Sequence, residues 1–95
     1  MKLSVAMVKR KILPILKKHR VEKAAIFGSV ARGEAKANSD VDILIQFKER
    51  RTLLDLGGLY VDLEKKLGRR PDLVTYGSIN SRLRPYIMRD KIDIL

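Results

Sequence analysis

The chain has 95 residues, with 21 lysines and arginines against 11 acidic residues and a formal net charge of +10. This length predicts one domain, residues 1–95, whose core is too small to enclose a ligand on all sides, so any site should be an open cleft. Cysteine is absent, which excludes disulfides, thiolate catalysis and zinc ribbons. The basic charge suits polyanions, acidic proteins or phosphorylated ligands without choosing between them.

The first segment has the pattern of an amphipathic helix from about Leu3 to His19. Its apolar residues recur at helical spacing: Val5, Val8, Ile12, Ile15 and Leu16. We expect Pro14 to kink or break this helix, because proline lacks the backbone N–H. The charges at residues 9–11 come too early for a secretory core or a membrane span, so we expect a cytoplasmic protein that makes no membrane contact.

Two strands follow. "VEKAAIFG" predicts a short buried strand that ends at Gly28, and "SVARGEA" a single helical turn or short helix. "VDILIQF" alternates along its length. One face of this strand carries Val41, Ile43, Ile45 and Phe47, and the other carries Asp40, Asp42, Leu44 and Gln46.

The second half predicts helix, strand, helix and a short edge strand. A helical stripe runs from about Arg51 to Leu67, closed by Gly68: Leu53, Leu56, Tyr60, Leu63 and Leu67. "RPDLVTY" predicts a third strand, a last helix should begin near Ser78 or Asn80, and "DIL" could add an edge strand. Pro85 suggests that the last helix starts late or bends. The alternation predicts an α/β (mixed α+β) fold, a small mixed twisted sheet flanked by helices.

Three aspartates are the candidate catalytic and metal-binding residues. Asp40 and Asp42 lie two residues apart, so they project from one face of the strand with no cation between them. Two such carboxylates repel each other, and Mg²⁺, which prefers oxygen ligands, would relieve that repulsion. Asp72, at the start of the third strand, could join them as a second-metal ligand or general base, giving a site for one or two ions.

A candidate phosphate-binding turn precedes the carboxylates. Gly28 and Ser29 end a strand and open a short helix, so free backbone N–H groups should face a bound phosphate. Gly28 has no Cβ to obstruct the approach, Ser29 can donate its hydroxyl, and Arg32 can neutralise charge. The turn would hold the triphosphate of a nucleotide while the aspartates hold the metal.

Together these residues resemble the minimal nucleotidyltransferases, small members of the DNA polymerase beta-like nucleotidyltransferase superfamily. The matching pattern is Gly-Ser, Arg-Gly, then Ser-Asp-x-Asp before an apolar strand: Gly28, Ser29, Arg32, Gly33, Ser39, Asp40 and Asp42. The family's third acid matches Asp72. The resemblance covers nearly the whole chain, and it adds Ser39 to the expected nucleotide-binding residues Gly28, Ser29 and Arg32.

The resemblance implies a Mg²⁺-dependent enzyme that uses ATP as substrate. Many family members act as antitoxins of a HEPN-domain ribonuclease toxin encoded nearby, and some transfer AMP to a tyrosine of that toxin. Related antibiotic and RNA nucleotidyltransferases carry an additional helical domain that binds the acceptor. The single domain expected here lacks one, which favours a protein acceptor.

Two other functional classes stay open. One is an antitoxin that neutralises by binding alone, and the other is a basic nucleic-acid-binding module, motivated by the charge of +10. The three clustered acids favour catalysis over binding alone, and they disfavour phosphate-backbone binding at that face. Outside the motif we expect ordinary roles: His19 at a helix C-terminus, and Asp55 and Asp62 as solvated positions.

Overall fold

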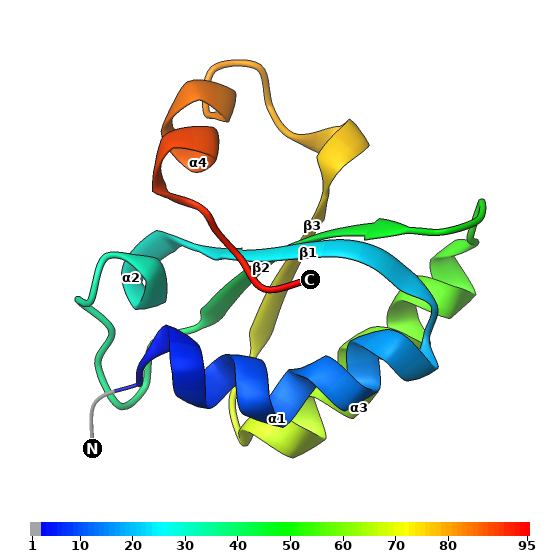
Figure 1. The fold of residues 1–95 in the computed structure, drawn as a ribbon, viewed down its shortest axis with the longest axis horizontal. Coiled ribbons are helices and arrows are strands. Elements are labelled where there is room, and N and C mark those ends of the chain that lie inside the picture. Colours follow the sequence, from blue (N-terminus) through cyan, green and yellow to red (C-terminus); the bar gives the residue numbers. More distant parts are fainter. Residues whose placement is uncertain (1–2) are drawn as a thin grey trace.

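The computed structural model describes residues 3–95 and shows a four-stranded mixed sheet with helices on both faces (Figure 1). The elements follow in the order α1 Val5–Lys18, β1 Val21–Phe27, α2 Gly28–Ala31, β2 Val41–Phe47, α3 Leu53–Leu67, β3 Pro71–Thr75, the 3₁₀ turn η1 Tyr76–Ser78, α4 Arg84–Asp90 and β4 Ile92–Asp93. This arrangement confirms the predicted α/β fold class.

The sheet places its strands in the order β3-β2-β1-β4. β1 runs antiparallel to β2 and to β4, whereas β2 and β3 are parallel. The end of β1 therefore lies beside the starts of β2 and β3. All four predicted strands are present, including the short edge strand near the C-terminus.

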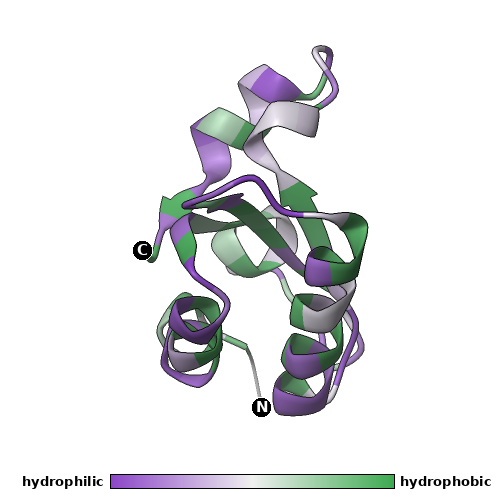
Figure 2. Cartoon of the chain, turned by 90° about the vertical axis from the view of Figure 1, so that its right-hand side faces the viewer, coloured by the Kyte–Doolittle hydropathy of each residue, from purple (hydrophilic) through white to green (hydrophobic). Residues whose placement is uncertain are grey.

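The two faces of the sheet have separate apolar clusters. The larger packs α1 and α3 on one face, where the alternation of β2 turns Val41, Ile43 and Ile45 inward. On the other face Leu44 packs with Ala25 and Phe27 beneath the segment that contains η1 and α4 (Figure 1). In Figure 2 the strands are mainly hydrophobic, whereas the helices mix hydrophobic and hydrophilic residues. α1 and α3 thus cover one face of the sheet with buried apolar residues.

The first helix is continuous through Pro14, so the expected break is absent. Ser4 caps its N-terminus, where the side chain accepts a hydrogen bond from the Met7 N–H at 3.2 Å. Pro14 lies on the exposed side, where water can satisfy the carbonyl that loses its partner. No helix within residues 3–95 has both the length and the apolar character that crossing a membrane requires.

The last helix begins at Arg84, later than the expected start near Ser78 or Asn80. Pro85 occupies its first turn, the one part of a helix where proline is tolerated, because a ring further along would clash with the preceding turn. The prediction that Pro85 makes the last helix start late is confirmed, whereas the predicted start near Ser78 or Asn80 is wrong.

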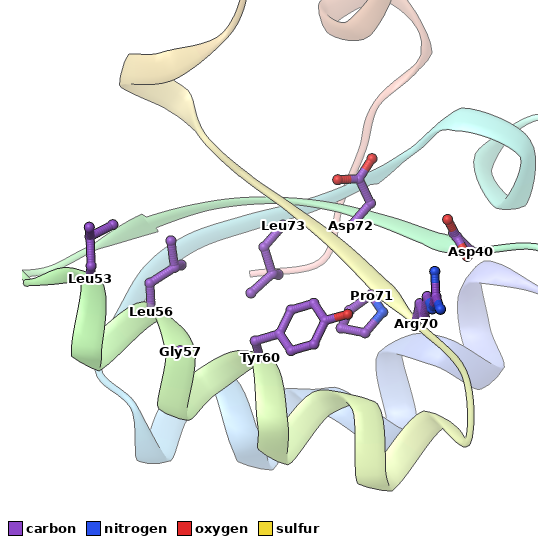
Figure 3. A pocket seen from close by; sticks show the side chains of 9 residues that line it. All are labelled: Asp40, Leu53, Leu56, Gly57, Tyr60, Arg70, Pro71, Asp72 and Leu73. Carbon is purple, nitrogen blue, oxygen red and sulfur yellow. The ribbon is translucent and has the colours of Figure 1, made fainter.

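The apolar stripe predicted for α3 is only partly buried. Leu63 and Leu67 are buried as expected, but Leu53 is 86% exposed, and Leu59, outside the predicted stripe, is fully buried. In Figure 3 Leu53, in the first turn of α3, lies at the left, away from Leu73 and Asp72 of β3. Leu53 is thus an exposed apolar residue at the edge of the sheet.

Candidate functional site

Two of the three predicted carboxylates lie side by side. Asp42 on β2 and Asp72 on β3 are register partners in the parallel pair, and Asp42 is also paired with Phe27 at the end of β1. Side chains at the same register of neighbouring strands share a face of the sheet. The fold therefore collects both acids at one end of the sheet, next to the turn that follows β1.

The environment of this pair disfavours negative charge. The pKa of Asp42 rises from its ordinary 3.8 to about 6. Burial is the largest cause, followed by a hydrogen bond with Asp72 and by the negative charges of Asp72 and Asp40, while Arg32 acts in the opposite direction. A cation bound between the carboxylates would relieve this cost.

Asp40 immediately precedes β2 and is exposed to solvent. Its charge acts on Asp42, but no group of three or more carboxylate or imidazole side chains within residues 3–95 is gathered tightly enough to hold a metal ion. An exposed aspartate changes rotamer on a fast timescale. Asp42 is half-buried, whereas Asp40 and Asp72 are exposed. Their carboxylate oxygens fit a hard cation such as Mg²⁺, and Asp40 would have to rotate its side chain to join the other two.

The turn after β1 is built around Gly28, whose φ of +70° lies in the left-handed region. A Cβ at this position would collide with the Asp42 carboxylate. Ser29 follows in the first turn of α2 and is partly exposed. Because α2 has only four residues, its free N–H groups, rather than a helix dipole, are what the turn offers a phosphate. The structure brings Gly28 and Asp42 together.

Arg32 is the basic side chain whose charge favours the ionised form of Asp42. It makes ion pairs with Glu34 at 3.1 Å and with Asp90 of α4 at 3.6 Å, and its side chain is 45% exposed. The hydrogen bond that Arg32 donates to Glu34 is the main cause of its raised pKa. Both ion pairs are exposed and weak, so Arg32 can exchange them for a phosphate.

Ser39 lies in the loop before β2, where its hydroxyl accepts a hydrogen bond from the Lys36 N–H at 2.8 Å. Its carbonyl accepts another from Arg69 at 3.3 Å. These contacts shape the loop that delivers Asp40 to the strand, and they leave the hydroxyl proton of Ser39 free to bond elsewhere.

A groove of about 490 Å³ borders the carboxylates along the outer edge of β3 (Figure 3). Its lining is Asp40, Leu53, Leu56, Gly57, Tyr60, Arg70, Pro71, Asp72 and Leu73. Sequence reasoning missed this groove. The available signal was the apolar stripe on α3, whose first members Leu53, Leu56 and Tyr60 line the groove.

His19 and Asp62, for which we expected ordinary roles, form a hydrogen bond with each other. His19, at the C-cap of α1, donates through Nε2 to Asp62 Oδ2 of α3 at 2.7 Å, and Lys18 lies 3.5 Å from the same oxygen. The His19 bond and the Lys18 charge lower the pKa of Asp62. Asp55 is also engaged, because it forms a capping box with Thr52 at the start of α3. Neither aspartate is merely solvated.

A paired carboxylate beside a glycine-serine turn, on a small mixed sheet, is the arrangement of an enzyme that transfers phosphoryl groups. The chain belongs to the nucleotidyltransferase domain family, whose model matches residues 9–94. This membership confirms the predicted resemblance and the assignment of the chain as a nucleotidyltransferase.

Individual relatives of the chain are named as adenylyltransferases. A Methanocaldococcus jannaschii protein with the provisional name protein adenylyltransferase MJ0435 is 50% identical over 88 residues, which cover 93% of this chain and 95% of the relative. The protein adenylyltransferase MntA of Thermococcus cleftensis is 43% identical over 72 residues, 76% of this chain and 73% of the relative.

Solved structures confirm the fold. One provisionally described as a minimal nucleotidyltransferase has a TM-score of 0.78 at 40% identity and covers 93% of this chain and 90% of its own. A toxin-antitoxin complex with AMP-PNP (TM-score 0.80, 22% identity, 92% and 72% coverage) is similar in fold. So is a complex of a tri-AMPylated Shewanella oneidensis HEPN toxin with its MNT antitoxin (TM-score 0.73, 18% identity, 95% and 71% coverage).

Proposed function

We propose that this nucleotidyltransferase transfers AMP from ATP to a protein hydroxyl, a tyrosine of a HEPN-domain toxin encoded nearby, and thereby acts as an antitoxin in the cytoplasm. The observation that carries the proposal is Asp42, which is half-buried, lies against the Gly28 turn and is the register partner of Asp72. The raised pKa of Asp42, beside free N–H groups, suits a metal-bound triphosphate.

The comparisons support the acceptor class. Two relatives above 40% identity are named as protein adenylyltransferases. Two proteins of the same fold were solved as toxin-antitoxin complexes, one with AMP-PNP and one with an AMPylated HEPN toxin. A protein acceptor and an adenine nucleotide are therefore the first substrates to test.

In the proposed reaction the acceptor hydroxyl oxygen forms a bond to the α-phosphorus of ATP. The bond from that phosphorus to the bridging oxygen breaks, and pyrophosphate leaves with the electron pair. Asp72 takes the hydroxyl proton and passes it to solvent. Mg²⁺, held by Asp40, Asp42 and Asp72, would supply charge neutralisation when bound.

The remaining site residues position the nucleotide. The backbone N–H groups after Gly28 and the hydroxyl of Ser29 face the phosphates, and Arg32 compensates their charge after leaving Glu34. Ser39 holds the loop that carries Asp40 and supplies its free hydroxyl proton to the nucleotide.

The test is incubation with ATP and Mg²⁺, with and without the HEPN-domain protein encoded beside this gene, followed by intact-mass measurement of both chains. We expect the mass of AMP on the partner, and its loss in Asp40→Asn/Asp42→Asn. The matched control Glu22→Gln/Glu64→Gln removes two carboxylates that are exposed on β1 and α3 and should keep the transfer.

Two results would contradict the proposal. Full transfer by the Asp40→Asn/Asp42→Asn variant would exclude the metal assignment. A stable complex with no added mass on either chain would favour an antitoxin that acts by binding alone.

A further inference from the structure

The groove along the outer edge of β3 is lined by Asp40 and Asp72, but by none of the proposed phosphate-binding residues Gly28, Ser29 and Arg32. We infer that it binds the segment of the protein substrate that carries the acceptor hydroxyl, as an extended strand whose apolar side chains beside the acceptor residue enter the groove. The inference rests on the proposed function and deepens it, because it names the shape and chemistry of the acceptor.

The order of the strands gives the direction of approach. The phosphate turn follows β1, Asp42 lies on β2, and Asp72 lies on β3, so the three features follow one another across the end of the sheet. In a displacement at phosphorus the attacking and leaving oxygens lie roughly in line on opposite sides. With pyrophosphate held on the β1 side, the acceptor has to arrive from the β3 side.

The groove lies on that side and has the composition of a peptide site. Its apolar lining comes from Leu53, Leu56 and Tyr60 of α3 and from Pro71 and Leu73 of β3. Figure 3 shows Asp72 and Asp40 toward one end of this lining. An acceptor segment in the groove would therefore run past the carboxylates.

The backbone of β3 can hold such a segment. In the described part of the chain β3 is an edge strand, with β2 on one side. The Val41 N–H donates to the Arg70 carbonyl at 3.0 Å, so Arg70 turns its backbone groups toward β2. Because these groups alternate along a strand, Leu73 turns its N–H and carbonyl outward, where they can pair with an added strand.

A segment that pairs with β3 would place its alternate side chains on opposite faces of the sheet. Asp72 and Leu73 point to opposite faces, Leu73 toward α3 and Asp72 away from it (Figure 3). A residue paired opposite Asp72 would present its hydroxyl on the carboxylate face. The next residue would point with Leu73 into the groove. The site would thus select a tyrosine flanked by apolar residues.

The first test compares two surface variants of α3, Leu53→Asn and Val61→Asn. Leu53 lines the groove and is 86% exposed, whereas Val61 lies outside the lining and is 45% exposed. Both changes replace an exposed apolar residue by a neutral amide, so neither alters the charge near the carboxylates. The acceptor is the HEPN-domain protein of the first experiment.

We expect Leu53→Asn to raise the KM for the acceptor protein and its dissociation constant at least fivefold, with the KM for ATP unchanged, and Val61→Asn to change each less than twofold. Equal acceptor KM values for wild type and Leu53→Asn would overturn the inference and leave the proposed function intact. If the wild type transfers no AMP, the proposed function fails, and the dissociation constants still decide whether the groove binds this protein.

The second test changes the acceptor. After the modified tyrosine is located by peptide mapping, its two neighbours in the acceptor sequence are replaced by serine. We expect these replacements to raise the acceptor KM at least fivefold with the wild-type enzyme. With the Leu53→Asn enzyme the same replacements should raise it less than twofold, because the two changes remove the same contact. Additive effects, or a modified tyrosine without an apolar neighbour, would overturn the inference.

Discussion

Gly28 lies against the carboxylate of Asp42, because the residue before it, Phe27, is the register partner of Asp42 across β1 and β2. The glycine also has a φ of +70°. Position 28 thus needs glycine for two reasons, the left-handed backbone and the absence of a Cβ beside Asp42. The phosphate turn and the carboxylate pair form one packed unit.

Replacing Gly28 by alanine should therefore damage both stability and activity. Gly33→Ala is the matched control, since Gly33 has a similar φ of +73° but nothing within 4 Å of its added Cβ. We expect Gly33→Ala to cost about 1 kcal/mol in unfolding free energy from backbone strain. Gly28→Ala should cost clearly more in urea unfolding and abolish AMP transfer, because it displaces Asp42. Equal losses would show that the contact with Asp42 is unimportant.

The raised pKa of Asp42 predicts that Asp42→Asn stabilises the protein at neutral pH. The folded state binds this proton more tightly than the unfolded state, so stability falls as the pH rises from the ordinary 3.8 to about 6. A shift of this size corresponds to ~3 kcal/mol at most, and to about 1 kcal/mol after allowance for the half-exposed position. We expect Asp42→Asn to exceed wild type by about that amount at pH 7.5.

Urea unfolding from pH 3.5 to 8 measures this difference. It should be smallest at pH 3.5, where Asp42 is protonated in the folded state and mostly protonated in the unfolded state, and so resembles asparagine. Glu64→Gln, on the exposed side of α3, controls for removing one negative charge from a basic protein. A gain for Asp42→Asn that is the same at both ends of the pH range would contradict the raised pKa.

Local patterns were sufficient to predict the strands and the aspartates. The alternation of β2 fixes which residues face the core, and it places Asp42 on the opposite face. The position of Asp72 beside Asp42 needed a further assumption, that β2 and β3 are neighbours, which a strand-helix-strand unit usually satisfies.

Features that depend on packing between distant segments were not predictable. The stripe on α3 gives a helix but not which of its turns the sheet covers, so Leu53 was counted in the apolar stripe and Leu59 was missed. The bond between His19 and Asp62 joins residues 43 positions apart, and no local spacing indicates it. The groove beside β3 was missed for the same reason.

Arg32 should contribute to nucleotide binding through its charge. Arg89 is the matched control, because it also contacts Asp90, at 3.3 Å, but its guanidinium lies over the ring of Tyr86. We expect Arg32→Ala to raise the KM for ATP about tenfold through loss of a charge-assisted bond to phosphate, and Arg89→Ala to change it less than twofold. Steady-state kinetics with varied ATP measure this, and similar KM values for the two variants would exclude the role of Arg32.

The contact between His19 and Asp62 should stabilise the packing of α1 on α3. His19 is 20% exposed at 2.7 Å from Asp62, whereas Lys18 is 73% exposed at 3.5 Å, so His19→Ala should lower the unfolding midpoint more than Lys18→Ala. Because the pKa of Asp62 is lowered in the fold, its contribution is present above the ordinary 3.8 and disappears as the pH falls through the folded value.

A double-mutant cycle of His19→Ala with Asp62→Asn isolates that contact from the packing of the imidazole ring. We expect a stabilising coupling in urea unfolding at pH 6 that weakens as the pH falls below the ordinary 3.8 of an aspartate. A coupling of zero at pH 6 would show that the bond between His19 and Asp62 does not stabilise the packing of the two helices.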